Sequence, residues 1–304
     1  MTGGNTNIGS INNGPGTVNM GPTAPGGIQH NVYNVPAQAP GAAAEGPVGP
    51  PVDVGILTVL PVETRAVVEV LERQAGYHSE VLPGGARGHE ALFGPSGEQV
   101  RVACVQSLAP GPYSASEGYR RLRHRYAPPV LLLVGIAGGI HPDVAIGDVV
   151  IGTQVIYYDA RKETEAGPVR RGETKPVTAE LQNRLNDFMR GGQDIVVGRG
   201  RTVRVHCGPI GSGSAVVAYA EAELRRYLAA FNDKTLAVET EAAGFAQAFH
   251  EEDGDLADRA RGWLTVRGIS DLADALKHDG AHEVASRNAA AVMERLVPYL
   301  RVPS

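Results

Sequence analysis

The chain has 304 residues, of which 33 are acidic and 28 are basic, so its formal net charge is −5. This balance argues against a surface that mainly binds nucleic acid, and no apolar run approaches the roughly 18 residues of a membrane-spanning helix. Because the start also lacks a basic stretch leading into an apolar one, we expect a soluble cytoplasmic protein. Cys104 and Cys207 lie apart in β-like runs and form no metal-ligand pair, so we expect two buried thiols.

Residues 1–51 differ in composition from the rest of the chain. They are rich in Gly, Asn, Pro and Ala and carry one charged side chain, Glu45. Such a segment buries too little apolar surface to offset the entropy lost on ordering. Isolated β-branched residues between Asn and Gly, as in residues 31–35 (NVYNV), suit the stacked strands of a self-assembly motif. A plain disordered tail is the alternative, and residues 36–51 have the composition of a linker.

Residues 52–304 are predicted to fold, and they begin with a buried strand over 54–59. A helix over 61–73, a strand over 99–105 and a helix over 113–126 follow. The unbroken apolar run 130–134 (VLLLV) is typical of a central strand buried on both faces. It leads into Gly135, Gly138 and Gly139, and Gly147 opens a second apolar run. A glycine turn after a buried strand indicates either a ligand site of an open α/β sheet or a turn chosen for packing.

The second half of the chain repeats this alternation. Residues 161–175 are predicted to form a basic surface loop. The later predicted elements are helices over 177–189, 215–231 and 281–300, strands over 203–207 and 263–266, and a short strand at 236–239 that runs into an Ala-rich helix. This order predicts an α/β fold, a three-layer sandwich around a mostly parallel or mixed central sheet.

Several acids stand where the predicted strands end. Glu63 follows the first strand, Glu239 and Glu241 follow a late one, and Asp271 follows the last. A carboxylate in such a place costs solvation energy unless it is paired or used. Any one of them is explained by an ion pair, but together, beside two glycine turns, they indicate a site.

Five blocks of sequence resemble one family, and they occur in that family's order. They are residues 54–63, 134–139 with 147–148, 208–213, 238–243 and 267–274. The chain is similar over 52–297 to the purine nucleoside phosphorylase/nucleosidase superfamily, on the hydrolytic branch that includes methylthioadenosine/S-adenosylhomocysteine nucleosidase. The resemblance implies a homo-oligomer that acts on a purine nucleoside or nucleotide without a metal or organic cofactor.

The resemblance also implies roles for individual residues. Glu63 matches the acid that activates the attacking water, and Asp271, paired with Ser270, matches the donor of a proton to purine N7. Glu241 matches the carboxylate that holds the ribose hydroxyls. Further residues match the sugar turn, the purine contacts and the rest of the substrate site: Gly138 and Gly139; Val216 and Val217; Ala137, Glu239 and Thr240.

This arrangement suits hydrolysis of an N-glycosidic bond. Protonation of N7 lets the purine depart, the sugar passes through an oxocarbenium-like state, and a base on the opposite face supplies the water. The sequence departs from the family at Ile136, where a hydroxyl residue is common, and at Thr240, where a Met is usual. These departures leave a catalytically inactive nucleotide-sensing module as one alternative, and a phosphate-dependent phosphorylase is the alternative among enzymes.

The basic segment 161–171, together with Lys277, resembles one subgroup of the family. In this subgroup, nucleosidase domains are fused to signalling segments in bacterial and fungal immunity-type proteins. Arg161, Lys162 and Lys277 stand in places that imply contacts with the 5′-phosphates of an ATP-like substrate, although Glu163 and Glu165 partly cancel the charge. The low-charge tail likewise resembles the amyloid-like signalling motifs of such effectors, which implies a partner with a matching motif.

Overall fold

The computed structural model describes residues 52–165, 167–197, 200–214, 223–252, 259–273 and 279–301. The elements of the first half are β1 (Val54–Thr58), α1 (Pro61–Leu71), β2 (Ala75–Val81), β3 (Arg87–Phe93), β4 (Val100–Gln106), α2 (Pro112–Tyr126), β5 (Val130–Gly139) and β6 (Val149–Tyr157). The later elements are β7 (Arg161–Thr164), β8 (Gly167–Arg170), β9 (Glu173–Pro176), α3 (Ala179–Met189), β10 (Asp194–Val197), β11 (Arg201–Ser212), α4 (Glu223–Phe231), β12 (Ala237–Glu239), α5 (Ala242–His250), β13 (Gly262–Asp271), α6 (Asp279–Leu296) and a 3₁₀ helix (Val297–Leu300).

One mixed sheet forms the centre of the fold, as the sequence predicts. Its strand order is β10-β11-β6-β13-β5-β1-β4-β3-β2, with β12 and β9 attached beside this path. Strands β4, β1, β5 and β13 are parallel neighbours, whereas β6 runs antiparallel to β13. Strand β13, which comes last in the sequence, therefore lies in the interior of the sheet, between β5 and β6.

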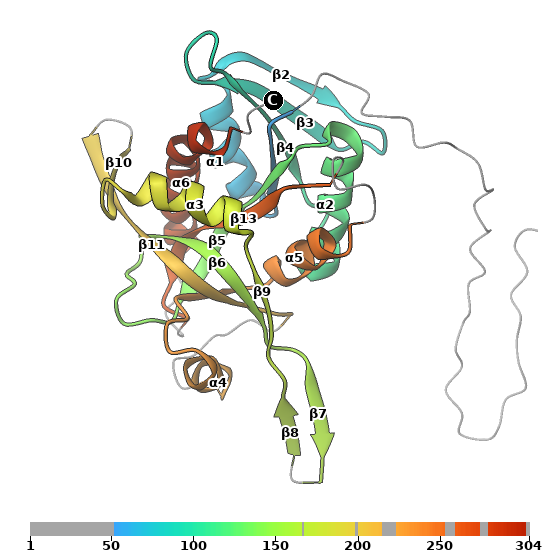
Figure 1. Ribbon diagram of the computed structural model, residues 1–304, viewed down its shortest axis with the longest axis vertical. Helices are drawn as coiled ribbons and strands as arrows, with labels where there is room; N and C mark the ends of the chain where they lie inside the picture. The colour runs from blue at the N-terminus through green and yellow to red at the C-terminus, as the bar shows by residue number, and fades with distance from the viewer. Residues whose placement is uncertain are drawn as a thin grey trace, which may run out of the picture. The chain divides into compact units, whose positions relative to one another are not determined.

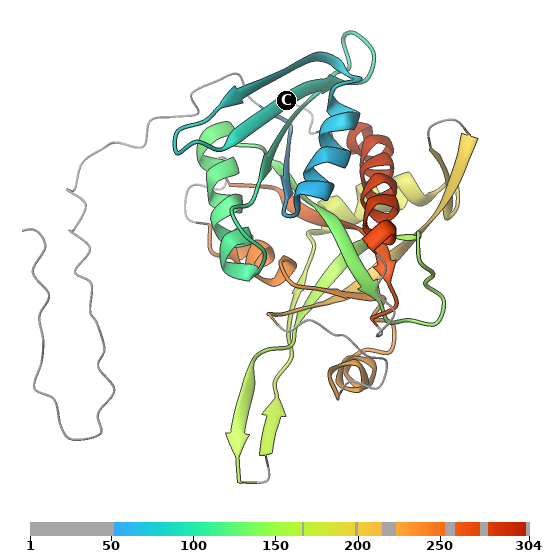
Figure 2. The ribbon, with the colours of Figure 1, turned by 180° about the vertical axis from the view of Figure 1, so that it is seen from behind.

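The central strand β5 is buried on both faces, which confirms the prediction from its unbroken apolar run. Its alternate residues enter different cores. Val130, Leu132 and Val134 pack in the core under α1, α3 and α6, whereas Leu131 and Leu133 pack in the core under α2 and α5. Figures 1 and 2 show these helices on opposite faces of the sheet, so the fold is a three-layer α/β sandwich.

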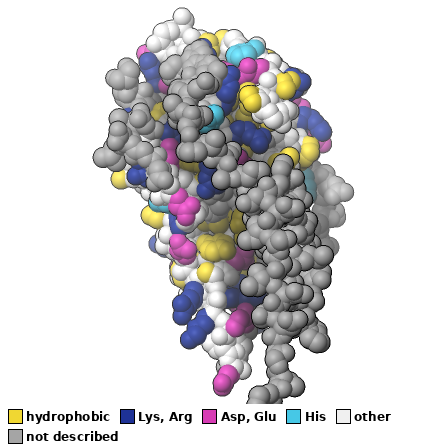
Figure 3. All heavy atoms as spheres, turned by 90° about the vertical axis from the view of Figure 1, so that its right-hand side faces the viewer, with side chains coloured by type: hydrophobic (Ala, Val, Ile, Leu, Met, Phe, Trp, Pro, Cys, Tyr) yellow, Lys and Arg dark blue, Asp and Glu magenta, His cyan; other side chains and the backbone are white. Residues whose placement is uncertain are grey.

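The predicted loop over 161–175 is wrong. Strands β7 and β8 form a separate two-stranded hairpin, with Arg161 opposite Arg170, and β9 joins the edge of β6. Figure 1 shows the hairpin extending beyond the sheet, and Figure 3 shows basic and acidic side chains together at that end. Both faces of β7 are charged and exposed, so it lacks the apolar alternation that marks a half-buried strand.

Four further expectations differ from the structure. Gly135, Gly138 and Gly139 continue β5 and pair within the sheet, so they do not form the expected turn. Strands β2 and β3 form an antiparallel extension of the sheet that the sequence reading did not assign. Cys104 is buried as expected, but Cys207 is exposed on β11. The last helix changes to 3₁₀ geometry at Val297, next to Pro298, which has no N–H to donate to a helical carbonyl.

Some expectations fall outside the described residues, namely those for the tail 1–51 and for residues 215–222 and 274–278. Among the helices that the structure does describe, none is both long and apolar enough to cross a membrane.

Candidate active site

The predicted acids meet at one edge of the sheet, where β1, β5 and β13 end. A cavity of about 220 Å³ opens there. Gly138 on β5 pairs with Asp271 on β13 and with Val238 on β12, so it links the two strands that carry the acids. The cavity is lined by Val59, Leu60, Glu63, Pro110, Ile136, Ala137, Gly138, Val238, Glu239, Thr240, Glu241, Ser270, Asp271 and His282.

Glu63 is held by backbone donors from two strand ends. It is the third residue of α1, after a Pro that suits the first turn of a helix. Its Oε2 accepts hydrogen bonds from the N–H groups of Val59 (2.9 Å) and Leu60 (2.7 Å), and its Oε1 accepts one from Ile136 (2.9 Å). Burial raises the pKa of Glu63, while Arg267 and these three donors oppose the rise. A fixed carboxylate with a raised pKa is a suitable general base.

Arg267 is the one fully buried guanidinium among these acids in the described part of the chain. Its Nη2 donates to Oε2 of Glu239 and lies 3.5 Å from Oε2 of Glu241. Burial alone lowers the pKa of Arg267, but Glu239, Glu241 and Glu63 raise it above its usual value. The side chain is therefore charged and offsets part of the negative charge of the site.

Glu239 and Glu241 have different surroundings although they are two residues apart. Glu239 accepts hydrogen bonds from the N–H groups of Glu241 and Ala242, at the start of α5, where the helix dipole favours a carboxylate. Burial raises the pKa of Glu239 above its usual value, and the positive charge of Arg267 opposes part of this rise. In Glu241, Oε1 accepts hydrogen bonds from Gly111 N–H (3.0 Å) and Thr240 Oγ1 (2.6 Å), so Oε2 is the oxygen with fewer contacts. Glu239 thus organises the helix start, and Glu241 keeps an oxygen for a ligand.

Asp271 is fixed through both of its oxygens. Oδ1 accepts a hydrogen bond from Ala273 N–H (2.8 Å), and Oδ2 lies 2.9 Å from Ser270 Oγ. Ser270 Oγ also lies 3.4 Å from the carbonyl of Ala137. A hydroxyl carries one proton, so Ser270 either donates to Asp271 or donates to Ala137 and accepts from a protonated Asp271. The pair therefore accommodates both protonation states of the acid.

Gly135 precedes the cavity-lining residue Ile136. Because it has no Cβ, it leaves room for the side chains of Glu63 and Arg267. A Cβ at this position would overlap Glu63 Oε1 and lie 2.5 Å from Nη1 of Arg267. Both Nε and Nη1 of Arg267 have no hydrogen-bond partner although they are buried. Unpartnered N–H groups in a buried guanidinium are costly, and Nη1 is near the oxygen of the proposed base.

The structure does not gather every predicted residue. Ala137, Gly138 and Thr240 line the cavity, but Gly139 does not: a Cβ there would meet Ile269 and Val144, so this glycine serves packing. Arg161 and Lys162 are exposed on β7, and Arg161 is 2.7 Å from Glu163. Val216, Val217 and Lys277 lie outside the described residues.

Two titratable residues, one beside the cavity and one lining it, are not predicted from the sequence. Arg267 interrupts the apolar strand β13, and a charge in a buried strand is itself a signal, because an arginine is rarely fully buried unless it is paired. His282 lines the cavity from α6, but a single histidine near a helix start carries no signal of this kind.

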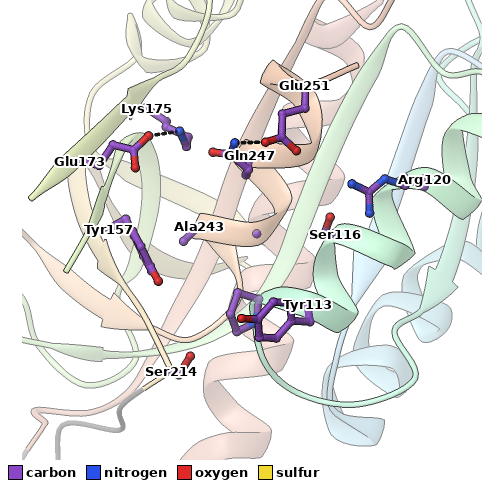
Figure 4. Close-up of a pocket in the computed structure, with 12 residues that line it drawn as sticks. Tyr113, Ser116, Arg120, Tyr157, Glu173, Lys175, Ser214, Ala243, Gln247 and Glu251 are labelled. Atoms are coloured by element: carbon purple, nitrogen blue, oxygen red, sulfur yellow. Dashed lines mark hydrogen bonds and ion pairs between the residues drawn. The ribbon is translucent and has the colours of Figure 1, made fainter. Parts of the chain in front are cut away.

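A second, larger cavity of about 480 Å³ lies over the outer face of α5. Figure 4 shows Tyr113 and Arg120 on one side and Tyr157 on the other, with ion pairing between Lys175 and Glu173. None of the four buried acids lines it, so size alone is a poor guide, and the smaller cavity is the candidate active site. The described residues also contain no group of three or more His, Cys, Asp or Glu side chains arranged to hold a metal ion.

A family model described as the phosphorylase superfamily matches residues 53–298. The chain belongs to this superfamily. The match includes all five motif blocks and all the described elements that form the cavity.

Individual members of the phosphorylase superfamily are similar to this chain. The ATP nucleosidase Cap17 of Escherichia coli (strain KTE188) is 28% identical over 255 residues, which cover 78% of this chain and 49% of that protein. The chain therefore spans about half the length of the curated relatives it matches.

Solved structures share the fold. One is 5′-methylthioadenosine/S-adenosylhomocysteine nucleosidase from Neisseria meningitidis in complex with methylthio-immucillin-A, with a TM-score of 0.62 and 22% identity over 81% of this chain and 98% of that one. Another is futalosine hydrolase of Helicobacter pylori, with a TM-score of 0.64 and 18% identity over 81% and 97% of the two chains. At these identities the likeness shows the fold.

Replacing Gly135 by Ala should disrupt the site from within. The added Cβ forces Glu63 and Arg267 apart, so we expect turnover to fall roughly 10²-fold, because small misplacements of reacting groups are costly. Gly191→Ala is the matched control, since a Cβ there meets nothing within 4 Å. Steady-state kinetics with thermal melting of both variants test this. Equal activity of the two variants would contradict the crowding argument.

Proposed function

We propose that this chain is an N-ribosyl hydrolase that releases a purine, adenine above all, from a nucleoside or nucleotide. The observation that carries the proposal is that Glu63, Glu241 and Asp271 line one cavity, with distinct hydrogen-bond environments. The similarity to nucleosidases in sequence and in fold supports it.

The three carboxyl groups divide the reaction between them. A protonated Asp271 donates its proton to N7, and the electron pair of the bond between C1′ and N9 leaves with the purine. Glu241 accepts hydrogen bonds from the ribose hydroxyls and stabilises the positive charge on the sugar. Glu63 takes a proton from water, whose oxygen bonds to C1′. The products are the free base and a ribose that keeps its 5′ group.

Water is favoured over phosphate as the nucleophile. Glu63 occupies the nucleophile side of the cavity, and its carboxylate would repel a phosphate dianion. Among the described residues that line the cavity, none is Lys or Arg. This supports a hydrolase rather than a phosphorylase.

The 5′ group of the substrate is a finer part of the proposal. We include ATP and AMP among the substrates because the similar protein from Escherichia coli is an ATP nucleosidase. The contacts expected from Arg161, Lys162 and Lys277 to phosphate stay a prediction. A role in defence, a cytoplasmic location and a homo-oligomeric state belong to the same proposal.

A substrate panel tests the function directly. The purified protein is incubated with adenosine, methylthioadenosine, AMP and ATP, each with and without inorganic phosphate, and free adenine and the sugar product are measured. Release of adenine without phosphate supports a hydrolase. Ribose 1-phosphate, formed only with phosphate, would identify a phosphorylase, and binding without turnover would identify a sensing module.

Substitution of the two proposed catalytic acids should separate binding from turnover. Asp271→Asn keeps the shape of the side chain but removes its transferable proton, and Glu63→Gln removes the base. We expect each to lower base release by roughly 10²-fold or more, because general acids and bases contribute about that much. Substrate affinity, measured by calorimetry, should change little. Wild-type rates in either variant would remove that residue from the mechanism.

The pH dependence of kcat/KM should reflect the environment of Glu63. Only deprotonated Glu63 accepts a proton from water, so activity is lost as the pH falls through its pKa. Because burial raises that pKa, the acid limb should lie above the ordinary glutamate value of about 4.3. The residual activity of Glu63→Gln should lack this limb. An acid limb at or below the ordinary value would argue against a buried base.

The tail is proposed as a self-assembly segment that concentrates the nucleosidase domains. Its near absence of charge and its Asn- and Gly-spaced β-branched residues support this. Deletion of residues 1–50 should leave base release per domain unchanged and remove higher-order assembly, measured by light scattering. A synthetic peptide of residues 1–35 that stays monomeric at high concentration, even with seeds, would leave only the linker reading.

A further inference from the structure

Arg225 connects α4 to both strand ends of the candidate active site. Its Nη2 donates to the carbonyl of Ile140 (2.8 Å), and its Nη1 donates to the carbonyl of Leu272 (3.0 Å). Ile140 directly follows Gly139, the last residue of β5, and Leu272 directly follows Asp271, the last residue of β13. One planar guanidinium therefore spans the two backbone segments that follow β5 and β13.

Helix α4 is positioned to deliver this side chain. Leu224 and Leu228 are one turn apart and buried, and they pack in a cluster that contains Ile140, Val238 and Ala273. Arg225 follows Leu224, so packing of the apolar face brings its guanidinium to the two carbonyls. The next residue, Arg226, is exposed.

The peptide group between Leu272 and Ala273 is held from both sides. Its carbonyl accepts the hydrogen bond from Arg225, and its N–H donates to Oδ1 of Asp271. Ala273 is buried and has a φ of 53°, a left-handed conformation that a residue with a Cβ adopts only when its surroundings impose it. Rotation of this peptide would remove the N–H from the carboxyl group. A cation on the carbonyl also polarises the peptide and strengthens its N–H as a donor.

We propose that Arg225 is a positioning residue for the acid: it fixes the Leu272–Ala273 peptide, and through it the orientation of Asp271 toward the leaving base. This inference rests on the proposed function. Arg225 does not line the cavity, so it acts on the reaction only through the backbone. The alternative is that it merely attaches α4 to the domain.

A double-mutant cycle separates the two readings, because residues that act as a unit are not additive. The full chain is compared as wild type, Arg225→Ala, Asp271→Asn and the combined variant, with adenine release from the best substrate of the panel as the readout. We expect Arg225→Ala to lower kcat roughly 10- to 100-fold with KM changed less than about threefold. In the Asp271→Asn background the same change should lower kcat less than about twofold.

Two further variants complete the design. Arg226→Ala, on the same helix, should keep the wild-type kcat, and Arg225→Lys should recover part of it, because an ammonium group reaches one carbonyl but lacks the fork that spans both. If Arg225→Ala does not fold by circular dichroism, the cycle is run with Arg225→Lys.

The outcomes are distinct. If Arg225→Ala lowers kcat equally in the wild-type and Asp271→Asn backgrounds, or in neither, the inference is overturned. The proposed function still stands in that case if the wild type releases base. A wild type that releases no base overturns both.

Discussion

The candidate site depends on one buried cation among several buried carboxylates. Arg267 is fully buried, contacts Glu239 and Glu241 and lies near Glu63. Taking such charges out of water is unfavourable unless they are paired, and loss of one partner of a buried pair costs about 3–5 kcal/mol. Arg267 therefore permits three glutamates to be buried together at the end of one sheet. Lysine would not replace it, because the planar guanidinium presents donors to several acceptors at once.

Around this cation, the carboxylates accept hydrogen bonds from different backbone groups. Glu239 takes the first N–H groups of α5, Glu63 takes those at the ends of β1 and β5, and Asp271 takes one from its own loop. Since each set of N–H groups is fixed by a strand or helix end, the fold gives each of these carboxylates its own hydrogen-bond donors.

Most of the fold, and the meeting of Glu63, Glu241 and Asp271 at one cavity, could be predicted from the sequence, whereas the contacts between distant strands could not. The VLLLV run predicts a central strand, and the motif blocks predict that Glu63 and Asp271 share a site. The partner of the acids was missed because Arg267 belongs to another strand, and a sequence alone does not show which side chains face each other. For the same reason the bonds of Arg225 to Ile140 and Leu272 were invisible: three segments distant in sequence meet there. The sequence predicts a loop in place of the hairpin β7–β8, because its charged residues show no alternation of apolar and polar side chains.

The place of β13 in the sheet has a consequence for synthesis of the protein. The ribosome makes β13 after every other described strand of the sheet, yet it lies between β5 and β6 and brings both Arg267 and Asp271. Until it emerges, the edges of β5 and β6 lack their central partner, and the acids from earlier segments lack their cation. Pairings between distant segments form late in folding. A nascent chain therefore contains no assembled cavity until residues 262–271 have left the ribosome, because these residues supply both the cation and one of the acids.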